Sequence, residues 1–228
     1  MRYRCFSQSD AAFIIDKQAT EIDINYFDLF SHHFGLFRHS DLEEIPVGFL
    51  RIVMLSETPS ASWIRNIARR YCLLQEIEKK SDARLPCFAL YPQKQIMMEF
   101  FNHLNHEETI GEASRFFVCE EERFLLPIKQ IITGEFSIGL LYLQHAFLGC
   151  FSTHAEAYNM FGFARFQGSA PFEIKTPGKT RIGEILYLNR SMIPPKFLAL
   201  SDKIQRQYLD AGELCYFGKS EKESSLNL

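Results

Sequence analysis

The chain has 228 residues, of which 46% are hydrophobic and 23% charged. That balance predicts an ordinary buried core and excludes intrinsic disorder, collagen-like repeats and a small disulfide-stapled protein. The 25 basic and 28 acidic side chains give a formal net charge of -3, so we expect no nucleic-acid partner, because phosphate-backbone binding draws on a clustered excess of basic side chains.

The N-terminal half is expected to combine strands with helices that cover them. Ser9 and Asp10 are typical N-cap residues in front of an apolar-periodic segment, and turn-forming residues between two β-rich runs predict a hairpin. A later segment carries apolar residues at helical spacing with charges between them. The expected elements are a strand at 2–8, a helix at 11–19, hairpin strands at 33–38 and 47–55, and helices at 60–80 and 95–104.

The C-terminal half continues this alternation. Pro127 opens a helical segment that runs to about His145, with the proline in its first turn. The other expected elements are strands at 113–119, 147–151, 162–167 and 184–189, and helices at 155–160 and 198–211. Neither an internal repeat nor a low-complexity linker interrupts them. The sequence therefore predicts one mixed α/β domain over residues 1–215, followed by a polar, flexible tail at 216–228.

Phenylalanine is over-represented, with 22 residues in the chain. Its side chain is bulky and apolar and has no polar group to satisfy. Two interpretations are open: a phenylalanine-rich core, which is the simpler one, or a pocket whose walls suit an apolar ligand.

Cysteine usage and hydropathy indicate the compartment. The six cysteines lie at least fifteen positions apart without a C-x-x-C pair, and the opening residues MRYRCF lack the apolar stretch of a signal peptide. We therefore expect a reduced, cytoplasmic protein. The most apolar window, 136–151, is shorter than the roughly 20 residues of a spanning helix, so no transmembrane segment is expected, while peripheral membrane contact stays open.

Residues 112–123 carry the most specific motif. Glu112, Ser114, Arg115, Val118 and Arg123 fit the pattern E-x-S-R-x-x-V-x-x-x-x-R. This pattern resembles the signature of the acyl-homoserine-lactone (autoinducer) synthases, the N-acyl amino acid synthases and the ornithine N-acyltransferases, a branch of enzymes with the GNAT fold. The resemblance implies a single GNAT-like domain with a mixed, mostly antiparallel central sheet flanked by helices.

Three weaker motifs occur in the order that this branch shows. Residues 23–28 (DINYFD) are similar to its acidic D-x-x-Y/F-D segment, residues 47–52 (VGFLRI) to its VGxxRL strand, and residues 157–163 (AYNMFGF) to the Y-x-x-x-G-F turn of GNAT enzymes. An isolated E-x-S-R string would favour a surface salt bridge between Glu and Arg. The order of the four motifs favours the functional interpretation instead.

Strand geometry limits how the motif can work. Side chains in a regular strand alternate between faces, so Glu112 and Ser114 share one face while Arg115 leaves from the other. Glu112 and Arg115 converge only if a β-bulge shifts this alternation, and the GNAT fold that the sequence resembles carries a bulge on the equivalent strand. A bulge also frees a backbone N–H that can donate to the oxyanion formed when an amine attacks a thioester.

The resemblance assigns roles to these side chains. Acylation of an amine needs a base, and Glu112 is the candidate base in a catalytic set with Ser114 and Arg115. The acidic pair Asp23 and Asp28 is placed in the acceptor pocket, although spacing alone favours a solvated loop equally. Arg51 and Arg115 could either neutralise these carboxylates or clamp an acceptor carboxylate. The other assigned residues are Phe116 and Val118 in the substrate wall and Arg123 at the co-substrate.

The segment after Val118 departs from ordinary GNAT enzymes. Those enzymes cradle the coenzyme A pyrophosphate with a glycine-rich loop, whereas residues 119–127 contain three glutamates and no glycine. This favours acyl carrier protein over acyl-coenzyme A as the thioester donor, with no other cofactor and no metal. An acidic carrier would dock on basic side chains, for which the candidates are Arg65, Arg69, Arg70 and Lys129.

The acceptor is expected to be an amino acid or a related small amine. Autoinducer synthases place an R-x-x-x-F pair and a Trp before the acidic segment, around S-adenosylmethionine, and this chain has only Trp63, after it. We therefore expect an N-acyltransferase for a long acyl chain. An acyl-homoserine-lactone synthase and a catalytically silent module that binds acyl groups or carrier protein are the alternatives.

Overall fold

The computed structural model describes residues 23–39, 44–56, 58–59, 61–104, 107–118, 138–139, 141–176 and 179–211. The strand expected at 2–8, the helix at 11–19 and the tail at 216–228 lie outside these residues, as do Arg123 and Lys129. The expected domain limits therefore stay a prediction.

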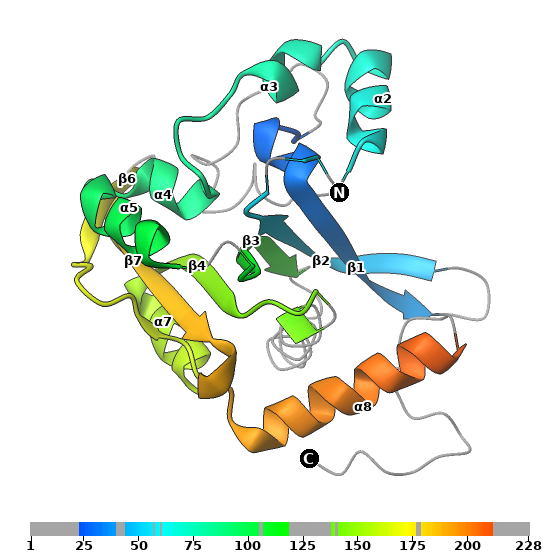
Figure 1. Cartoon of the computed structure of the whole chain (residues 1–228). Helices are drawn as coiled ribbons and strands as arrows, with labels where there is room; N and C mark the ends of the chain where they lie inside the picture. Colours follow the sequence, from blue (N-terminus) through cyan, green and yellow to red (C-terminus); the bar gives the residue numbers. More distant parts are fainter. Residues whose placement is uncertain are drawn as a thin grey trace.

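A seven-stranded sheet forms the middle of the molecule (Figure 1). Its strands are β1 (Ser31–His39), β2 (Glu44–Met54), β3 (Ile110–Val118), β4 (His145–Phe151), β5 (Ala164–Arg165), β6 (Phe172–Thr176) and β7 (Lys179–Asn189). They lie in the order β1-β2-β3-β4-β7-β5, and β6 also pairs with β7. Among these strands only β3 and β4 pair in parallel. The mixed, mostly antiparallel sheet of the sequence prediction is confirmed.

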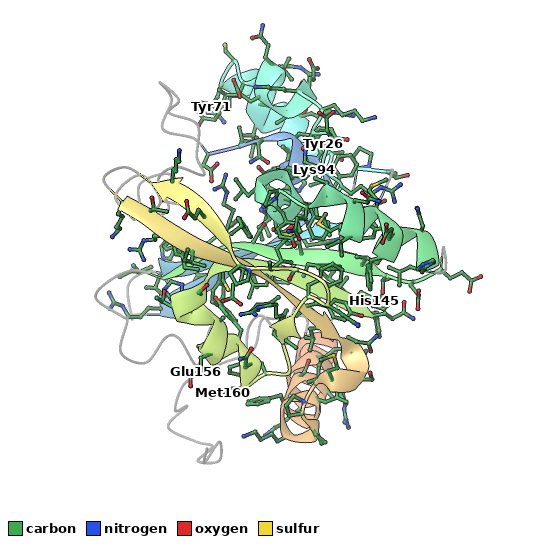
Figure 2. All side chains as sticks on the ribbon, turned by 90° about the vertical axis from the view of Figure 1, so that its left-hand side faces the viewer. Tyr26, Tyr71, Lys94, His145, Glu156 and Met160 are labelled. Atoms are coloured by element: carbon green, nitrogen blue, oxygen red, sulfur yellow. The ribbon has the colours of Figure 1, made fainter. Side chains whose placement is uncertain are left out.

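Helices cover both faces of this sheet (Figures 1 and 2). They are η2 (Tyr26–Phe30), α2 (Trp63–Arg70), α3 (Leu74–Glu78), α4 (Pro86–Leu90), α5 (Lys94–His103), α7 (Ser152–Asn159), η4 (Arg190–Met192) and α8 (Pro195–Ala211). Residues of η2 and of α2 to α5 pack into the core on one face, and residues of α7 and α8 into the core on the other. The fold thus has three layers around two hydrophobic cores.

Strand β2 shows how one segment serves both cores. Leu50 and Ile52 belong to the core under α7 and α8, and Val53 to the core under α2 to α5, because successive side chains leave a strand on opposite faces. A central strand covered on both faces needs a nearly continuous apolar run, and residues 47–54 provide it. Arg51 is the exception, because it shares the face of Val53 and is fully buried.

The sheet splits between its two parallel strands. Pairing of β3 with β4 runs only from Ile110 opposite His145 to Ala113 opposite Leu148, although both strands continue. Just beyond this point β3 carries the bulge that the motif requires: its register with β2 shifts between Phe117 and Ser114, and Arg115 has a φ of 53°. The bulge thus lies beside the opening between the strands.

Most predicted elements are confirmed, with three corrections. The helix expected at 60–80 is two helices, α2 and α3, because Cys72 adopts a left-handed backbone with φ of 58°. The helix expected to reach His145 ends earlier, since a turn at 141–142 precedes β4. Helix α4 and strand β6 were not predicted, since both are only five residues long and show little periodicity.

The turn after α7 depends on glycine. Gly162 has a φ of 95°, and a Cβ at this position would collide with the carbonyl oxygen of Met192. Only glycine meets both demands cheaply. The G-F part of the Y-x-x-x-G-F motif therefore fixes how the chain leaves α7, and it holds that helix against β4 and β7.

Candidate functional site

A cavity of about 430 Å³ occupies the split between β3 and β4. Residues of α4 line it from one face of the sheet, and residues of α7 line it from the other. Its wall joins the charged residues of the E-x-S-R motif to an apolar set of side chains. That apolar set includes Leu90, Phe116, Leu148, Phe151, Phe172 and Ile174.

Glu112 is the buried carboxylate of this cavity, and only 2% of its surface is exposed. Its neighbours across the sheet are Val53 on β2 and Phe147 on β4, so it stands in a row of buried apolar residues. Burial raises the pKa of Glu112 to about 7, against the lowering effect of its contacts with Cys87 and of the charges of Arg51 and Arg115. A carboxyl group of this kind exchanges its proton near neutral pH.

Arg51 is held in place by a network that begins in the acidic segment. Its Nη1 lies 3.1 Å from Oδ2 of Asp28 and donates to Oδ1 of Asn25 at 3.2 Å. Its Nε donates to Oγ of Ser114 at 3.0 Å. Asp28 is fully buried, and its carboxylate also accepts from the backbone N–H of Asn25 at 2.8 Å, a capping box that starts η2.

Arg115 forms the second buried ion pair. Its Nη2 lies 3.2 Å from Oδ1 of Asp23, and both side chains are buried. The left-handed backbone at Arg115 is uncommon for a residue with a side chain, and it lets Arg115 and Glu112 line the same cavity. The convergence that a regular strand forbids is thus achieved through the bulge.

The structure brings most of the predicted site residues together, but not all of them. Glu112, Ser114, Arg115, Arg51 and Phe116 line the cavity. Asp23 and Asp28 do not line it and instead lie behind the two arginines, which they hold. The backbone of Val118 pairs with that of Gly48 at the end of β3. Arg123 lies outside the described residues, so its role stays a prediction.

Tyr158 and Cys87 are among the cavity residues to which the sequence analysis gave no role. Tyr158, on α7, is the first residue of the Y-x-x-x-G-F motif, which was recognised without giving the tyrosine a role. Burial raises the pKa of Tyr158, and Cys150 adds to this effect, so its hydroxyl stays protonated at neutral pH. Cys87 on α4 donates its backbone N–H to Oε2 of Glu112 at 2.8 Å, and no sequence pattern pointed to it.

The site combines three chemical capacities. Glu112 can accept a proton near neutral pH, Arg51 and Arg115 present positive charge, and Tyr158 can donate a proton. Within the part of the chain that is described, no group of three or more His, Cys, Asp or Glu side chains could hold a metal ion. None of the described helices combines the length and the apolar character needed to cross a bilayer.

Solved structures similar to this chain include enzymes of the branch that its motifs resemble. FeeM, an N-acyl amino acid synthase from uncultured soil microbes, is 12% identical with a TM-score of 0.48, over 85% of this chain and 94% of FeeM. BjaI, a CoA-dependent acyl-homoserine lactone synthase solved with SAM and isopentyl-CoA, is 12% identical with a TM-score of 0.47, over 89% of this chain and 77% of BjaI.

A third similar structure is TofI in a ternary complex with an inhibitor and MTA. It is 12% identical with a TM-score of 0.49, over 88% of this chain and 85% of TofI. Likenesses at this identity concern the fold alone. No family model and no curated protein sequence matches the chain.

Proposed function

We propose that the protein is an N-acyltransferase that moves a long acyl chain from an acyl carrier protein thioester to the primary amine of an amino acid or a related small amine. The observation that carries this proposal is Glu112, a buried carboxyl group with a pKa of about 7 that lines a cavity with two arginines. An amine must lose a proton as it attacks a carbonyl, and a base works best when its pKa lies near the working pH.

The other groups of the cavity fit the remaining steps of aminolysis. The amine nitrogen bonds to the thioester carbon, the C–S bond breaks, and the departing sulfur takes up a proton. We assign that proton to the Tyr158 hydroxyl, because it lines the same cavity and is protonated at neutral pH. The bulge at Arg115 supports stabilisation of the oxyanion, because a backbone N–H that leaves the strand pairing can donate to it.

The two ends of the cavity suit two different parts of the substrates. The apolar wall, with Phe116, Phe151 and Phe172, suits an acyl chain, because each buried methylene contributes about 0.8 kcal/mol. At the charged end Arg51 and Arg115 suit the carboxylate of an amino acid. Asp23 and Asp28 fix these arginines, so a direct contact between either aspartate and the amine stays a prediction.

Product analysis tests the proposal. Purified protein is incubated with an acyl carrier protein thioester, or with the matching acyl-coenzyme A, together with a panel of amino acids and, separately, with S-adenosylmethionine. We expect N-acyl amino acids in the mass spectrum, formed faster from the carrier protein. Formation of acyl-homoserine lactone without acylated amino acids would show that the acceptor is S-adenosylmethionine and not an amino acid. The absence of product with every acceptor would favour the silent binding module.

Glu112→Gln tests the base directly. We expect turnover to fall by about a hundredfold or more, the usual contribution of a positioned base, and the rise of kcat/KM with pH through about 7 to disappear. The matched control is Glu184→Gln, a buried carboxylate of the same cavity that bonds to Arg165 at 2.9 Å; it should keep the pH dependence. Full activity of Glu112→Gln would rule out this base.

A further inference from the structure

Asn25 is a polar residue of the cavity that the acyl transfer outlined above does not use. It belongs to the acidic segment at 23–28 and is the N-cap of η2. The two aspartates of this segment lie behind the arginines, whereas Asn25 and Phe27 line the cavity itself. The side chain through which this segment offers a polar contact to a ligand is therefore that of Asn25.

The hydrogen bonds of Asn25 leave one end of its amide for a ligand. Its Oδ1 accepts from the backbone N–H of Phe27 at 3.1 Å and from Nη1 of Arg51 at 3.2 Å. These two donors identify the oxygen end of the amide, and they use both lone pairs of that oxygen. The amide nitrogen Nδ2 bonds to no described residue, so toward a ligand the Asn25 side chain acts as a donor.

Arg51 offers a second donor beside this amide. Its Nη1 is engaged by Asp28 and Asn25 and its Nε by Ser114, while Nη2 forms no hydrogen bond within the part of the chain that the structure describes. Only 2% of the Arg51 surface is exposed and the residue lines the cavity, so a ligand reaches this nitrogen through the cavity. Two neighbouring N–H donors, one of them charged, match the two oxygens of a carboxylate.

We propose that Asn25 is a specificity-determining residue that binds the carboxylate of the acceptor together with Arg51. One carboxylate oxygen accepts from Nδ2 of Asn25 and the other from Nη2 of Arg51, so the site selects α-amino acids over amines without a carboxylate. The proposal rests on the proposed function in taking this cavity as the place of acyl transfer.

The spacing of the site suits an α-amino acid. Arg51 bonds to Ser114, which lies two residues after Glu112 on β3, and two residues span about 6.6 Å along a strand. An α-amino acid carries its amine and its carboxylate on one carbon. It can therefore reach Glu112 with the amine and the donor pair with the carboxylate, through hydrogen bonds of about 2.9 Å each.

Two substitutions remove the donor and keep the cap of η2. Asn25→Asp retains an oxygen for Phe27 and Arg51 and is an equally good N-cap, but it replaces Nδ2 by a second oxygen that repels a carboxylate. Asn25→Ser also caps a helix and loses the donor without adding charge. The matched control is Asn189→Asp: Asn189 caps η4 by accepting from the backbone N–H of Ser191, and it does not line the cavity. Urea unfolding checks that all three variants are folded.

The first experiment compares two acceptors with the acyl carrier protein thioester: the amino acid of the panel that is acylated fastest, and its carboxamide. Asn25→Asp should lower kcat/KM for the amino acid by about tenfold to a hundredfold, because a hydrogen bond to a charged group is lost and repulsion is added. The loss should lie mainly in KM, since the contact exists in the ground state and the transition state alike. The carboxamide should be nearly unaffected, because its own N–H groups can donate to the introduced carboxylate.

The other two variants sharpen this comparison. Asn25→Ser should lower kcat/KM for the amino acid by a smaller factor, and Asn189→Asp should leave both acceptors unchanged. An indirect effect through η2 or Glu112 would slow the amino acid and the carboxamide equally. Equal losses for the two acceptors in Asn25→Asp would therefore overturn the proposal, as would full activity of that variant with the amino acid.

The second experiment needs no acyl transfer. The amino acids of the panel and their carboxamides are titrated into the protein in a calorimeter without a thioester. The unmodified protein should bind its preferred amino acid about tenfold or more tightly than the carboxamide, and Asn25→Asp should abolish this preference. Equal or absent binding of the two ligands by the unmodified protein would overturn the carboxylate site. The expected preference without any acylated product would reject only the proposed function.

Discussion

The two halves of the sheet bury different chemistry. On β2 and β3, together with η2, the buried side chains include Arg51, Asp28, Arg115 and Asp23 in two ion pairs. On β4 and β7, together with α4 and α5, aromatic rings pack edge to face or tilted against one another. That aromatic cluster consists of Phe88, Phe100, Phe101, Phe147, Phe166 and Tyr187.

Glu112 stands where these halves meet. It belongs to the charged strand β3, but its neighbour across the parallel pair is Phe147, the fully buried centre of the aromatic cluster. A carboxylate is expensive to bury without a partner, and here the aspartates already engage the arginines. Glu112 is therefore left with a raised pKa. Its position between the two halves makes its charged form unfavourable for stability and, for the same reason, makes it able to exchange a proton at neutral pH.

The charged half should suffer most from the loss of one partner. Asp28→Ala leaves the buried Arg51 without its carboxylate and removes a cap of η2, so we expect a loss of about 3–5 kcal/mol in unfolding free energy, measured by urea denaturation. The control is Arg165→Ala, in an ion pair with the buried Glu184 whose arginine side chain is 52% exposed; because water can reach this pair, the expected loss is smaller, about 1–2 kcal/mol. Equal losses would show that the Arg51 pair is as solvated as the Arg165 pair.

Glu112→Gln should stabilise the protein, and the gain should depend on pH. The folded-state pKa of about 7 lies above the ordinary value of 4.5, so the carboxyl group favours folding when protonated, and this contribution disappears as the pH rises through about 7. Unfolding curves should coincide below about pH 4.5 and differ by about 3 kcal/mol at most above pH 7.

The control for that pH dependence is Glu184→Gln. Burial opposes ionisation of Glu184, yet the hydrogen bond from Arg165 and the charge of Arg165 lower its pKa. The charged form therefore favours folding, and Glu184→Gln should cost stability at neutral pH, with the difference vanishing in acid. If both variants changed the unfolding free energy at neutral pH in the same direction, Glu112 and Glu184 would not differ in which protonation state favours folding.

The sequence analysis recovered what local spacing encodes. The hairpin of β1 and β2, the motif strand β3 and the helices α5, α7 and α8 all follow from alternation or helical periodicity. The argument about faces showed only that Glu112 and Arg115 need a bulge in order to meet, and the resemblance to the GNAT fold implied that β3 carries one, which the structure shows. The two interpretations of the phenylalanines both apply, since Phe147 packs the core and Phe116 lines the cavity.

The contacts that the sequence could not give join distant segments. Cys87 meets Glu112 from a helix of five residues, and its approach depends on Gly149 in a third segment. Tyr158 enters the cavity only because β3 and β4 separate, which is a property of the pairing and not of either strand. The acidic segment was placed in the acceptor pocket, whereas its aspartates reach the site through Arg51 and Arg115.

In the aromatic half, a conservative substitution should reduce the unfolding free energy less than the loss of a buried ion-pair partner does. Phe147→Leu keeps an apolar side chain but removes a ring that contacts Phe88, Phe101 and Tyr187. We expect unfolding free energy to fall by about 1–2 kcal/mol. The control is Phe37→Leu on β1. Phe37 is 44% exposed, so the unfolding free energy should change by no more than about 0.5 kcal/mol. Equal losses of unfolding free energy in Phe147→Leu and Phe37→Leu would show that the ring contacts of the aromatic cluster do not stabilise the fold.

The smallest expected effect is on the rate of the reaction with the acyl carrier protein donor, which we expect to dock on the surface of α2. This helix exposes Arg65, Arg69 and Arg70 and packs against η2, from which Phe27 lines the cavity. Tyr71 lies at its outer end (Figure 2), where Arg70 stacks 5.8 Å from the ring centre. An acidic carrier protein docked there would be attracted by charge, which accelerates association more than it tightens the complex.

Arg69→Glu should therefore lower kcat/KM for the acyl carrier protein donor by several-fold to about tenfold at low salt, and the difference should shrink as added salt screens the charges. The same variant should leave kcat/KM for the matching acyl-coenzyme A unchanged, because that donor needs no docked protein. Lys203→Glu, an exposed lysine on α8 at the opposite end of the molecule (Figure 1), makes the same change in net charge and should leave both donors unaffected. If Lys203→Glu slows the carrier-dependent reaction as much as Arg69→Glu does, overall charge and not α2 guides the donor. If Arg69→Glu lowers kcat/KM equally for both donors, the substitution disturbs the cavity through the contact of α2 with η2, and α2 is not a docking surface for the carrier protein.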